Sequence, residues 1–465
     1  MGVSSGVPDQ AASSTRCAAR CHGSYSRVPT SSSPPPCGTT LARSAPAKRR
    51  VAPGHSVPAR TSRSSATRTA SMGAHTASTR DSSAGVHREF PHVGEGVRMP
   101  EETAHSTRTV ETSVPFRAGR EGYASFRIPA VVVTQDGTVL AFCEGRVGSQ
   151  EDFGNIDVVL KRSMDGGRTW GPLQVVGANG TDLAGNPAPV VLDTGRILLV
   201  HIRNAAAATE NAIRRGQVSA ADGRRVWVRH SDDDGLTWSA PREITKQTKR
   251  PTWRWYATTP GHAVQLSGGR VVVPANHSLP PTGTDNGTEG KYNGGHCLLS
   301  DDRGQNWRIG YVDDNTNGYI NVNETTAAEL PDGRVYFNTR NDSPAPGTRA
   351  DAHSHDGGQT LAKPFRPQSC LTGPVVEASV LQLLDPDLLL YSGPADPGFR
   401  AQMSIRKSHD GGTTWHPAHT VDGLPAGYSD LARLDEDTVG LLYETGDFSA
   451  YETITFRRVP LHWLD

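Results

Sequence analysis

An eight-residue motif, Ser-x-Asp-x-Gly-x-Thr-Trp, recurs along the chain and places an acidic side chain at a fixed position. Asp and Gly recur in this way in calcium-binding loops, so cation binding is the first chemistry to consider. The motif itself fixes only one acidic residue per turn, which supplies too few oxygen ligands for calcium. We therefore interpret the motif as a tight turn in which Asp accepts backbone N–H groups, Gly takes a positive φ and Trp packs beneath the hairpin. Three copies are intact, starting at Ser163, Ser231 and Ser408, and two are degraded, starting at Ser300 and Ser354.

No other arrangement in the sequence predicts a metal or cofactor site. His262, His277 and His296 lack the spacing of metal ligands, and no His-x-x-x-His pattern falls on a helix. There is no glycine-rich loop of the form that holds phosphate groups. We expect neither a metal nor a cofactor. The cluster Trp-Arg-Trp-Tyr at 253–256 could line a sugar or aglycone subsite, or belong to the core.

The elements that must carry these residues are short β-strands closed by turns. A β-rich run at 128–134 is followed by Asp-Gly and a second run at 138–142, a hairpin pattern. The motif copies start 68, 69, 54 and 54 residues apart. Strands repeated at such a period are typical of a β-propeller with about one four-stranded blade per repeat. Five copies, together with a blade that shares strands with the chain end, predict an all-β fold of six blades over residues 109–465.

Residues 1–108 differ from the rest in composition and charge. They carry 14 Lys and Arg against 6 Asp and Glu, whereas residues 109–465 carry 34 against 42, so the neutral total hides two opposite parts. Runs rich in Ser, Thr, Ala, Pro and Arg with two aromatic residues cannot bury enough apolar area to fold, so we expect a disordered basic leader. Its scattered arginines do not predict nucleic-acid binding. No run is apolar enough for a transmembrane helix, and no apolar core of a signal peptide follows the N-terminal charges.

The repeated motif looks like the Asp box of sialidases, and the Phe-Arg-Ile-Pro sequence at 126–129 resembles a second motif of that family. Asp boxes occur in other propellers, but their combination with Arg-Ile-Pro is specific. The resemblance covers roughly residues 110–465 and is strongest to bacterial exo-α-sialidases (neuraminidases). It implies a retaining glycoside hydrolase that removes terminal α-linked sialic acids from glycoproteins, glycolipids such as gangliosides, and oligosaccharides. We expect a monomer, and the resemblance implies export although no signal peptide is evident.

Three arginines are expected to hold the substrate carboxylate, because the planar guanidinium pairs with a carboxylate in two places. By resemblance these are Arg127 in the Arg-Ile-Pro motif, Arg340 and Arg400. Arg406 is an alternative to Arg400. Glu444 matches the glutamate that orients the first arginine in the family.

A neutral nucleophile is expected, because an anionic Asp or Glu would be repelled by the substrate carboxylate, and sialidases use tyrosine. Tyr428 resembles the family's nucleophile and Glu324 resembles its base, 16 residues before Arg340. Glu329 is the alternative base, although its Glu-Leu-Pro-Asp-Gly context is typical of a strand end and turn.

The acid that protonates the leaving group is expected in the loop at 144–157, which matches the family loop that bears this residue. Asp152 is our choice and Glu151 the alternative. Arg146 is expected to support the site, either beside the substrate carboxylate or paired with an acidic neighbour. Two other functions stay open: transfer of sialic acid to a sugar, as in a trans-sialidase, and a non-catalytic glycan-binding propeller.

Overall fold

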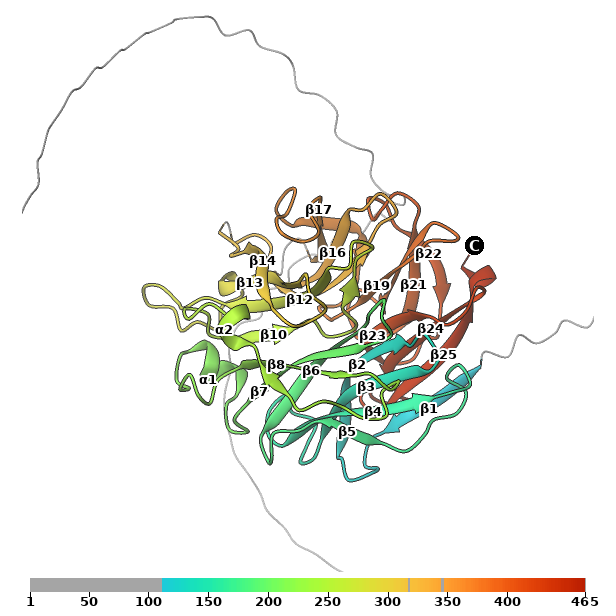
Figure 1. Cartoon of the computed structure of the whole chain (residues 1–465). Helices are drawn as coiled ribbons and strands as arrows, with labels where there is room; N and C mark the ends of the chain where they lie inside the picture. Colours follow the sequence, from blue (N-terminus) through green and yellow to red (C-terminus); the bar gives the residue numbers. More distant parts are fainter. Residues whose placement is uncertain (1–110, 317, 344–346, 465) are drawn as a thin grey trace, which may run out of the picture. The chain divides into compact units, whose positions relative to one another are not determined.

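The computed structural model describes residues 111–316, 318–343 and 347–464. The predicted leader, residues 1–108, lies outside the described residues, and the division of the chain at residue 108 stays a prediction. The described part is built almost entirely of antiparallel β-strands (Figure 1). Short runs of β-branched residues closed by glycine turns produce these strands, as the sequence predicts.

Four of the sheets have the size of propeller blades. Each consists of consecutive antiparallel strands, and in one of them the first described strand completes the last blade. Their strands are β1 (Thr112–Arg117) with β23 (Ala426–Arg433), β24 (Thr438–Thr445) and β25 (Thr453–Pro460); β10 (Tyr256–Thr258), β11 (Val264–Gln265), β12 (Val271–Ser278), β13 (Asn293–Ser300) and β14 (Arg308–Asp313); β15 (Val322–Glu329), β16 (Val335–Asn341), β17 (Thr348–Ser354) and β18 (Arg366–Thr372); and β19 (Ser379–Leu383), β20 (Leu388–Pro394), β21 (Met403–Ser408) and β22 (His416–Thr420).

The fifth sheet contains eight strands. They are β2 (Ser125–Val133), β3 (Val139–Arg146), β4 (Ile156–Ser163), β5 (Gln174–Gly177), β6 (Leu183–Val191), β7 (Ile197–Asn204), β8 (Arg225–Ser231) and β9 (Arg242–Glu243). A single parallel pair, Ile156 with Leu183, joins β4 to β6. The all-β propeller prediction is confirmed, but hydrogen bonding separates four blade-like sheets rather than the six expected, because this pair merges eight strands into one sheet.

The inner strands contact one another in a closed order, as Figure 1 shows around the centre of the fold. β2 contacts β6, β6 contacts β10, β12 contacts β15, β15 contacts β19, β19 contacts β23, and β23 returns to β2. Pairing of β1 with β25 closes the ring, and this agrees with the predicted sharing of strands between the two ends of the fold. Apolar clusters fill the spaces between neighbouring sheets, for example Val272, Leu299 and Phe337.

Helices are short and lie in the connections. They are α1 (Glu210–Arg214), α2 (Thr245–Thr248), and the 3-10 turns η1 (Gly290–Tyr292) and η2 (Leu461–Trp463). Within the described ranges, no helix has the length and apolar character needed to cross a membrane.

Each Asp-box turn lies between the last two strands of a consecutive antiparallel run. In the first copy the Asp165 carboxylate accepts the backbone N–H of Thr169 at 2.9 Å and the hydroxyl of the same residue at 2.6 Å. Gly167 has φ +87°, and the ring of Trp170 packs edge-on against Phe456. The other four copies repeat the hydrogen bonds from the seventh residue to the Asp. The interpretation of the motif as a tight turn is confirmed.

Asp430 on β23 ties several blades together near the centre. This carboxylate is fully buried and accepts hydrogen bonds from Val131 N at 2.8 Å and Ser379 Oγ at 2.7 Å. The backbone N–H and ring Nδ1 of His262 reach it at 2.9 and 2.7 Å. Three inner strands and one connecting loop therefore share a single buried anion.

Candidate active site

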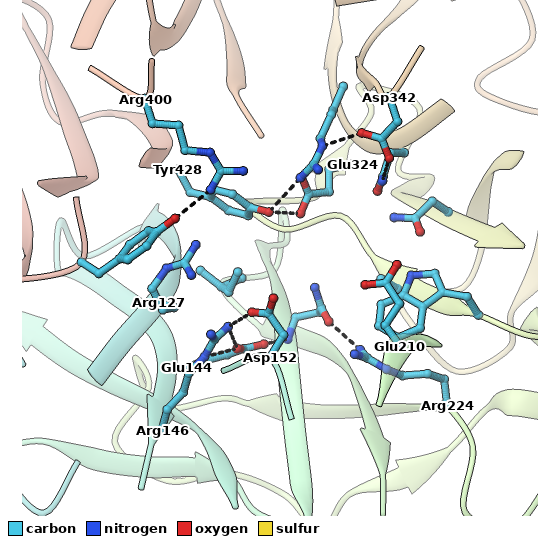
Figure 2. Close-up of a pocket in the computed structure, with 18 residues that line it drawn as sticks. Arg127, Glu144, Arg146, Asp152, Glu210, Arg224, Glu324, Asp342, Arg400 and Tyr428 are labelled. Carbon is cyan, nitrogen blue, oxygen red and sulfur yellow. Dashed lines mark hydrogen bonds and ion pairs between the residues drawn. The ribbon is translucent and has the colours of Figure 1, made fainter. Parts of the chain in front are cut away.

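A cavity of about 250 Å³ opens where the inner strands end (Figure 2). Its charged lining combines guanidinium and carboxylate groups in equal number. These residues are Arg127, Arg146, Arg224, Arg340, Arg400, Glu144, Asp152, Glu210, Glu324 and Asp342. Tyr428, Tyr451, Trp255 and the amides Asn186, Asn276 and Asn323 also line it. The cavity therefore contains all of the predicted catalytic residues and all three predicted arginines.

Four inner strands carry register irregularities at the level of the cavity. The shifts lie between Arg127 and Ala130 in β2, Gly185 and Ala188 in β6, Val322 and Thr325 in β15, and Ala426 and Ser429 in β23. An extra residue in one strand re-aims the adjoining side chains, which is why bulges occur beside active sites. These bulges carry Arg127, Asn186, Glu324 and Tyr428 into the lining.

Tyr428 and Glu324 form a close pair across two blades. The phenol of Tyr428 donates to Glu324 Oε1 at 2.5 Å, and Arg340 Nη1 donates to both the other carboxylate oxygen at 2.9 Å and the phenol oxygen at 3.2 Å. Both partners are at least nine-tenths buried. Glu329, the alternative base, instead accepts hydrogen bonds from Ser267 away from the cavity.

The three predicted arginines surround Tyr428. The guanidinium carbons of Arg127 and Arg400 lie 5.4 and 5.7 Å from the centre of the tyrosine ring, and Arg340 reaches its oxygen (Figure 2). Arg400 also donates to the Tyr451 hydroxyl at 3.0 Å, and Arg127 lies 4.0 Å from the centre of that ring. Arg406, the alternative to Arg400, donates to Cys370 O and is not part of the lining.

Glu444 on β24 supports two of the bulges from below. Its fully buried carboxylate accepts Arg127 Nε at 2.7 Å, Ile128 N at 2.9 Å and Tyr428 N at 3.0 Å. Ile128 has φ +65°, an unfavourable conformation for a β-branched residue that this hydrogen bond helps to hold. Glu444 thus fixes an arginine and the tyrosine backbone at once.

Asp152 projects into the cavity from the connection between β3 and β4. Its side chain is 69% exposed and pairs with Arg146 Nη2 at 2.7 Å. The buried Arg146 also donates to Glu144 Oε2 and to Gln150 O at 2.5 Å. Of the two roles left open for Arg146, the structure shows pairing with acidic neighbours. Glu151, one position away, is not part of the lining.

The charges shift the pKa of the two central titratable groups in opposite directions. Burial, and then the negative charge of Glu324, raises the pKa of Tyr428 well above its usual value, although three arginines oppose this. Burial also raises the pKa of Asp152, but Arg146, Arg127 and Arg224 together lower it below the usual value. In the free protein, therefore, the phenol is neutral at physiological pH and Asp152 is ionised.

Sequence reasoning missed Arg224, Asn186, Glu210 and Asp342. Arg224 is buried, donates to Asn186 Oδ1 at 2.8 Å and lies 3.9 Å from the centre of the Trp255 ring. Asp342 holds Arg340 Nε at 2.9 Å. The sequence offered one signal for Asp342, its position two residues after Arg340, because the side chains of residues i and i+2 point to the same face of a strand.

This arrangement can bind an anionic sugar and carry out acid and nucleophilic chemistry. Three guanidinium groups offer a site for a carboxylate. A neutral phenol hydrogen-bonded to a carboxylate is an arrangement that can activate a hydroxyl nucleophile, and the exposed Asp152 carboxylate lies across the cavity from it. Among the described residues no group of three or more His, Cys, Asp or Glu side chains could hold a metal ion.

The fold and site define an Asp-box propeller with an arginine-lined cavity, and comparison with known proteins agrees. A family model described as "BNR repeat-like domain" matches residues 137–442. A sialidase of Bacteroides fragilis is 32% identical over 371 residues, which cover 74% of this chain and 63% of that protein. An exo-alpha-sialidase of Aspergillus fumigatus is 30% identical, with 74% of this chain and 86% of that protein covered. The chain belongs to the sialidase family of BNR-repeat propellers.

A solved structure gives the same picture. The Hadza microbial sialidase Hz136 superimposes with a TM-score of 0.63 at 27% identity, covering 75% of this chain and 68% of that one. The chain spans under two thirds of the length of the Bacteroides relative.

Proposed function

We propose that the protein is a retaining exo-α-sialidase that releases terminal α-linked sialic acids from glycoproteins, glycolipids and oligosaccharides. The observation that carries the proposal is the Tyr428–Glu324 pair at 2.5 Å inside a ring of three arginines. A carboxylate bound by those arginines would lie beside the phenol. Each hydrogen bond to that carboxylate contributes about 1.5–3 kcal/mol to binding.

In the first step Tyr428 attacks the anomeric carbon C2 while Glu324 takes the phenol proton. The bond from C2 to the leaving-group oxygen breaks, and Asp152 gives that oxygen a proton. In the second step Asp152 takes a proton from water and the water oxygen attacks C2. The bond from C2 to the Tyr428 oxygen breaks, and this oxygen takes back its proton from Glu324. Two displacements retain the configuration at C2.

Asp152 must be protonated for the first step, although the arginines keep it ionised in the free protein. A bound substrate carboxylate would neutralise part of the positive charge and expel water from the cavity. Both changes disfavour the ionised form of Asp152 and raise its pKa. Substrate binding therefore favours the protonated form of Asp152 that the first step requires.

A Tyr428→Phe variant tests the proposal. We expect wild-type protein to hydrolyse an aryl sialoside, and the variant to lose at least about a hundredfold in kcat, because phenylalanine cannot form the covalent intermediate. Tyr292→Phe is the matched control, since its hydroxyl donates to Asp285 and the residue is not part of the cavity lining. A Tyr428→Phe protein as active as wild type would remove the nucleophile assignment. Wild-type protein that binds the sialoside without cleaving it would be a glycan-binding propeller.

Transfer to a sugar instead of water is the second function that the same chemistry allows. The covalent intermediate reacts with whichever hydroxyl reaches C2 first. Product analysis with an added acceptor sugar distinguishes the two, because a hydrolase releases free sialic acid even when the acceptor is abundant.

We infer that the propeller has six blades, with the eight-stranded sheet counted as two. Its halves, β2–β5 and β6–β9, are each antiparallel, and one parallel pair joins them. Each half has its own Asp box between its last two strands, at Ser163 and Ser231. The blade-like sheets that contain an Asp box have it at the same place.

A further inference from the structure

A second cavity of about 500 Å³ adjoins the candidate active site. It lies among α1, α2, the start of β8 and the loop that follows α2. Its lining holds one acidic residue, Glu243, and six basic ones. The basic residues are Arg224, Arg225, Lys246, Lys249, Arg250 and Arg254. We call this cavity the basic cleft.

The charge of the basic cleft is unusual for this propeller, since residues 109–465 carry more acidic than basic side chains. Carboxylates pair with two of the six basic residues, Arg225 with Glu243 at 3.5 Å and Arg250 with Asp314 at 3.7 Å. Within the described ranges no ion pair joins Lys246, Lys249 or Arg254 to an acidic group. Lys249 donates only to the carbonyl oxygens of Arg224 and Arg254, at 2.9 and 3.1 Å. Burial, and then the charge of Arg224, lowers the pKa of Lys249 to about 8. Crowded like charges of this kind are relieved by a bound anion.

Arg224 connects the basic cleft to the active site because it lines both cavities. Its side chain is nine-tenths or more buried, and one end donates to Asn186 in the active-site cavity (Figure 2). Its buried Nε has no hydrogen-bond partner among the described residues. This Nε is closed off from solvent, so the link between the basic cleft and the active site is the position of Arg224 in the wall of both cavities.

We propose that the basic cleft binds a carboxylate or sulfate on the inner sugars of a glycan whose terminal sialic acid occupies the active site. This proposal rests on the proposed function, since it names acidic glycans as a preferred class of its substrates. The arginines offer paired N–H groups to either anion, and the lysines add charge. Glycans with a second anionic group therefore bind more tightly than glycans that carry only the terminal sialic acid.

Binding is measured on the full chain with Tyr428→Phe, so that turnover does not enter. Calorimetry gives Kd for a trimer of α2,8-linked sialic acid, for a sialyl trisaccharide with a sulfate on its penultimate sugar, and for the same trisaccharide without sulfate. Lys246→Gln/Arg250→Gln removes two cleft charges. Arg117→Gln/Lys363→Gln, two exposed basic residues outside the cleft, is the matched control.

The two glycans with a second anionic group should bind more tightly than the unsulfated sialyl trisaccharide. We expect the cleft variant to lose about tenfold of this preference, while the control keeps it. Loss with the trimer alone assigns a carboxylate, and loss with the sulfated sugar alone assigns a sulfate. An unchanged preference for both anionic glycans, or equal affinity of all three glycans for Tyr428→Phe protein, would overturn the proposal. If Tyr428→Phe cleaves an aryl sialoside like wild type while the cleft preference persists, the nucleophile assignment fails and the cleft stands.

Discussion

At the scale of the residue, the ion pair of Asp152 with Arg146 governs the protonation of the proposed acid. Arg146 is buried and held by Glu144 and Gln150, so its position is fixed, while Asp152 is exposed to the cavity. The fixed positive charge beside this exposed carboxylate lowers its pKa in the free protein. In the proposed mechanism, a bound substrate carboxylate offsets that charge, so protonation of Asp152 is coupled to occupancy of the site.

We predict that Asp152→Asn impairs cleavage in proportion to the basicity of the leaving group. Cleavage of an alkyl sialoside should fall by about 10²–10⁴-fold, because its leaving oxygen requires a proton, and cleavage of a nitrophenyl sialoside by less. Comparison of kcat/KM for the two substrates checks this. Equal losses for both substrates would show that Asp152 is not the acid.

The direction in which kcat/KM changes with pH follows from the pKa of Asp152. The pKa of Asp152 is lowered in the free protein, and the acid acts in its protonated form. Wild-type kcat/KM for an alkyl sialoside should therefore decrease steadily as the pH rises above the acidic range, and Asp152→Asn should lose this dependence. Glu151→Gln is the matched control, and a profile that changed with this variant would favour the alternative acid.

Much of the site could be predicted from residues that lie in recognisable motifs. Arg127 stands in Phe-Arg-Ile-Pro, and Tyr428, Glu324 and Arg340 match family positions, so these four were found together in the cavity. Arg224 was missed because it precedes β8 in a loop without a motif. It acquires its place from Trp255 and Asn186, which lie 31 residues after it and 38 before it.

At the scale of the element, two glutamates hold bulges in neighbouring strands. Glu444 lies on β24 and Glu144 lies on β3. Glu444 holds the bulges of β2 and β23, and Glu144 accepts Asn186 N of β6 at 2.8 Å. A glycine next to each bulge, Gly427 or Gly185, leaves room for the carboxylate. Strand periodicity could not predict these bulges, because the register depends on the partner strand as well.

We predict that Gly427→Ala lowers activity while the protein stays folded. The added methyl group would collide with the Glu444 carboxylate, which three hydrogen bonds hold in place. Displacement of Glu444 should cost about 1–3 kcal/mol of stability and reduce kcat/KM, because Arg127 and Tyr428 move with it. Gly423→Ala, where nothing lies within 4 Å of the new atom, is the control. Thermal unfolding and aryl sialoside kinetics measure both effects, and wild-type kinetics for Gly427→Ala would contradict the role of Glu444.

At the scale of the whole molecule, the strand runs and the Asp-box period sufficed to predict a propeller, but not its division into sheets. The parallel pair of Ile156 with Leu183 merges two runs, and no sequence signal marks such a contact between strands that each have their own hairpin. The centre is stabilised by Asp430, whose partners come from residues 131, 262 and 379.

We predict a pH-dependent contribution of His262 to stability. Burial alone would lower its pKa, but the charge and hydrogen bond of Asp430 raise it overall. The folded state therefore binds this proton more tightly than the unfolded state does. The resulting stabilisation is fully present below about pH 6.5, the unfolded value, and is lost as the pH rises through the higher folded value.

Urea unfolding of wild type and His262→Gln at several pH values checks this prediction. The difference in the free energy of unfolding should be largest near pH 5.5 and should shrink as the pH rises. His416→Gln, an exposed histidine, should show no such trend. A difference that is constant with pH would mean that His262 stabilises the centre as a neutral ring.

The hydrogen bond between Arg127 and Glu444 joins residues 317 positions apart. A ribosome makes β2 before β24, so the nascent chain carries Arg127 without its partner Glu444 until β24 has been made. The strained backbone at Ile128 cannot be held until β24 emerges. The contacts that Glu444 makes with Arg127, Ile128 and Tyr428 can therefore form only after β24 has joined the sheet.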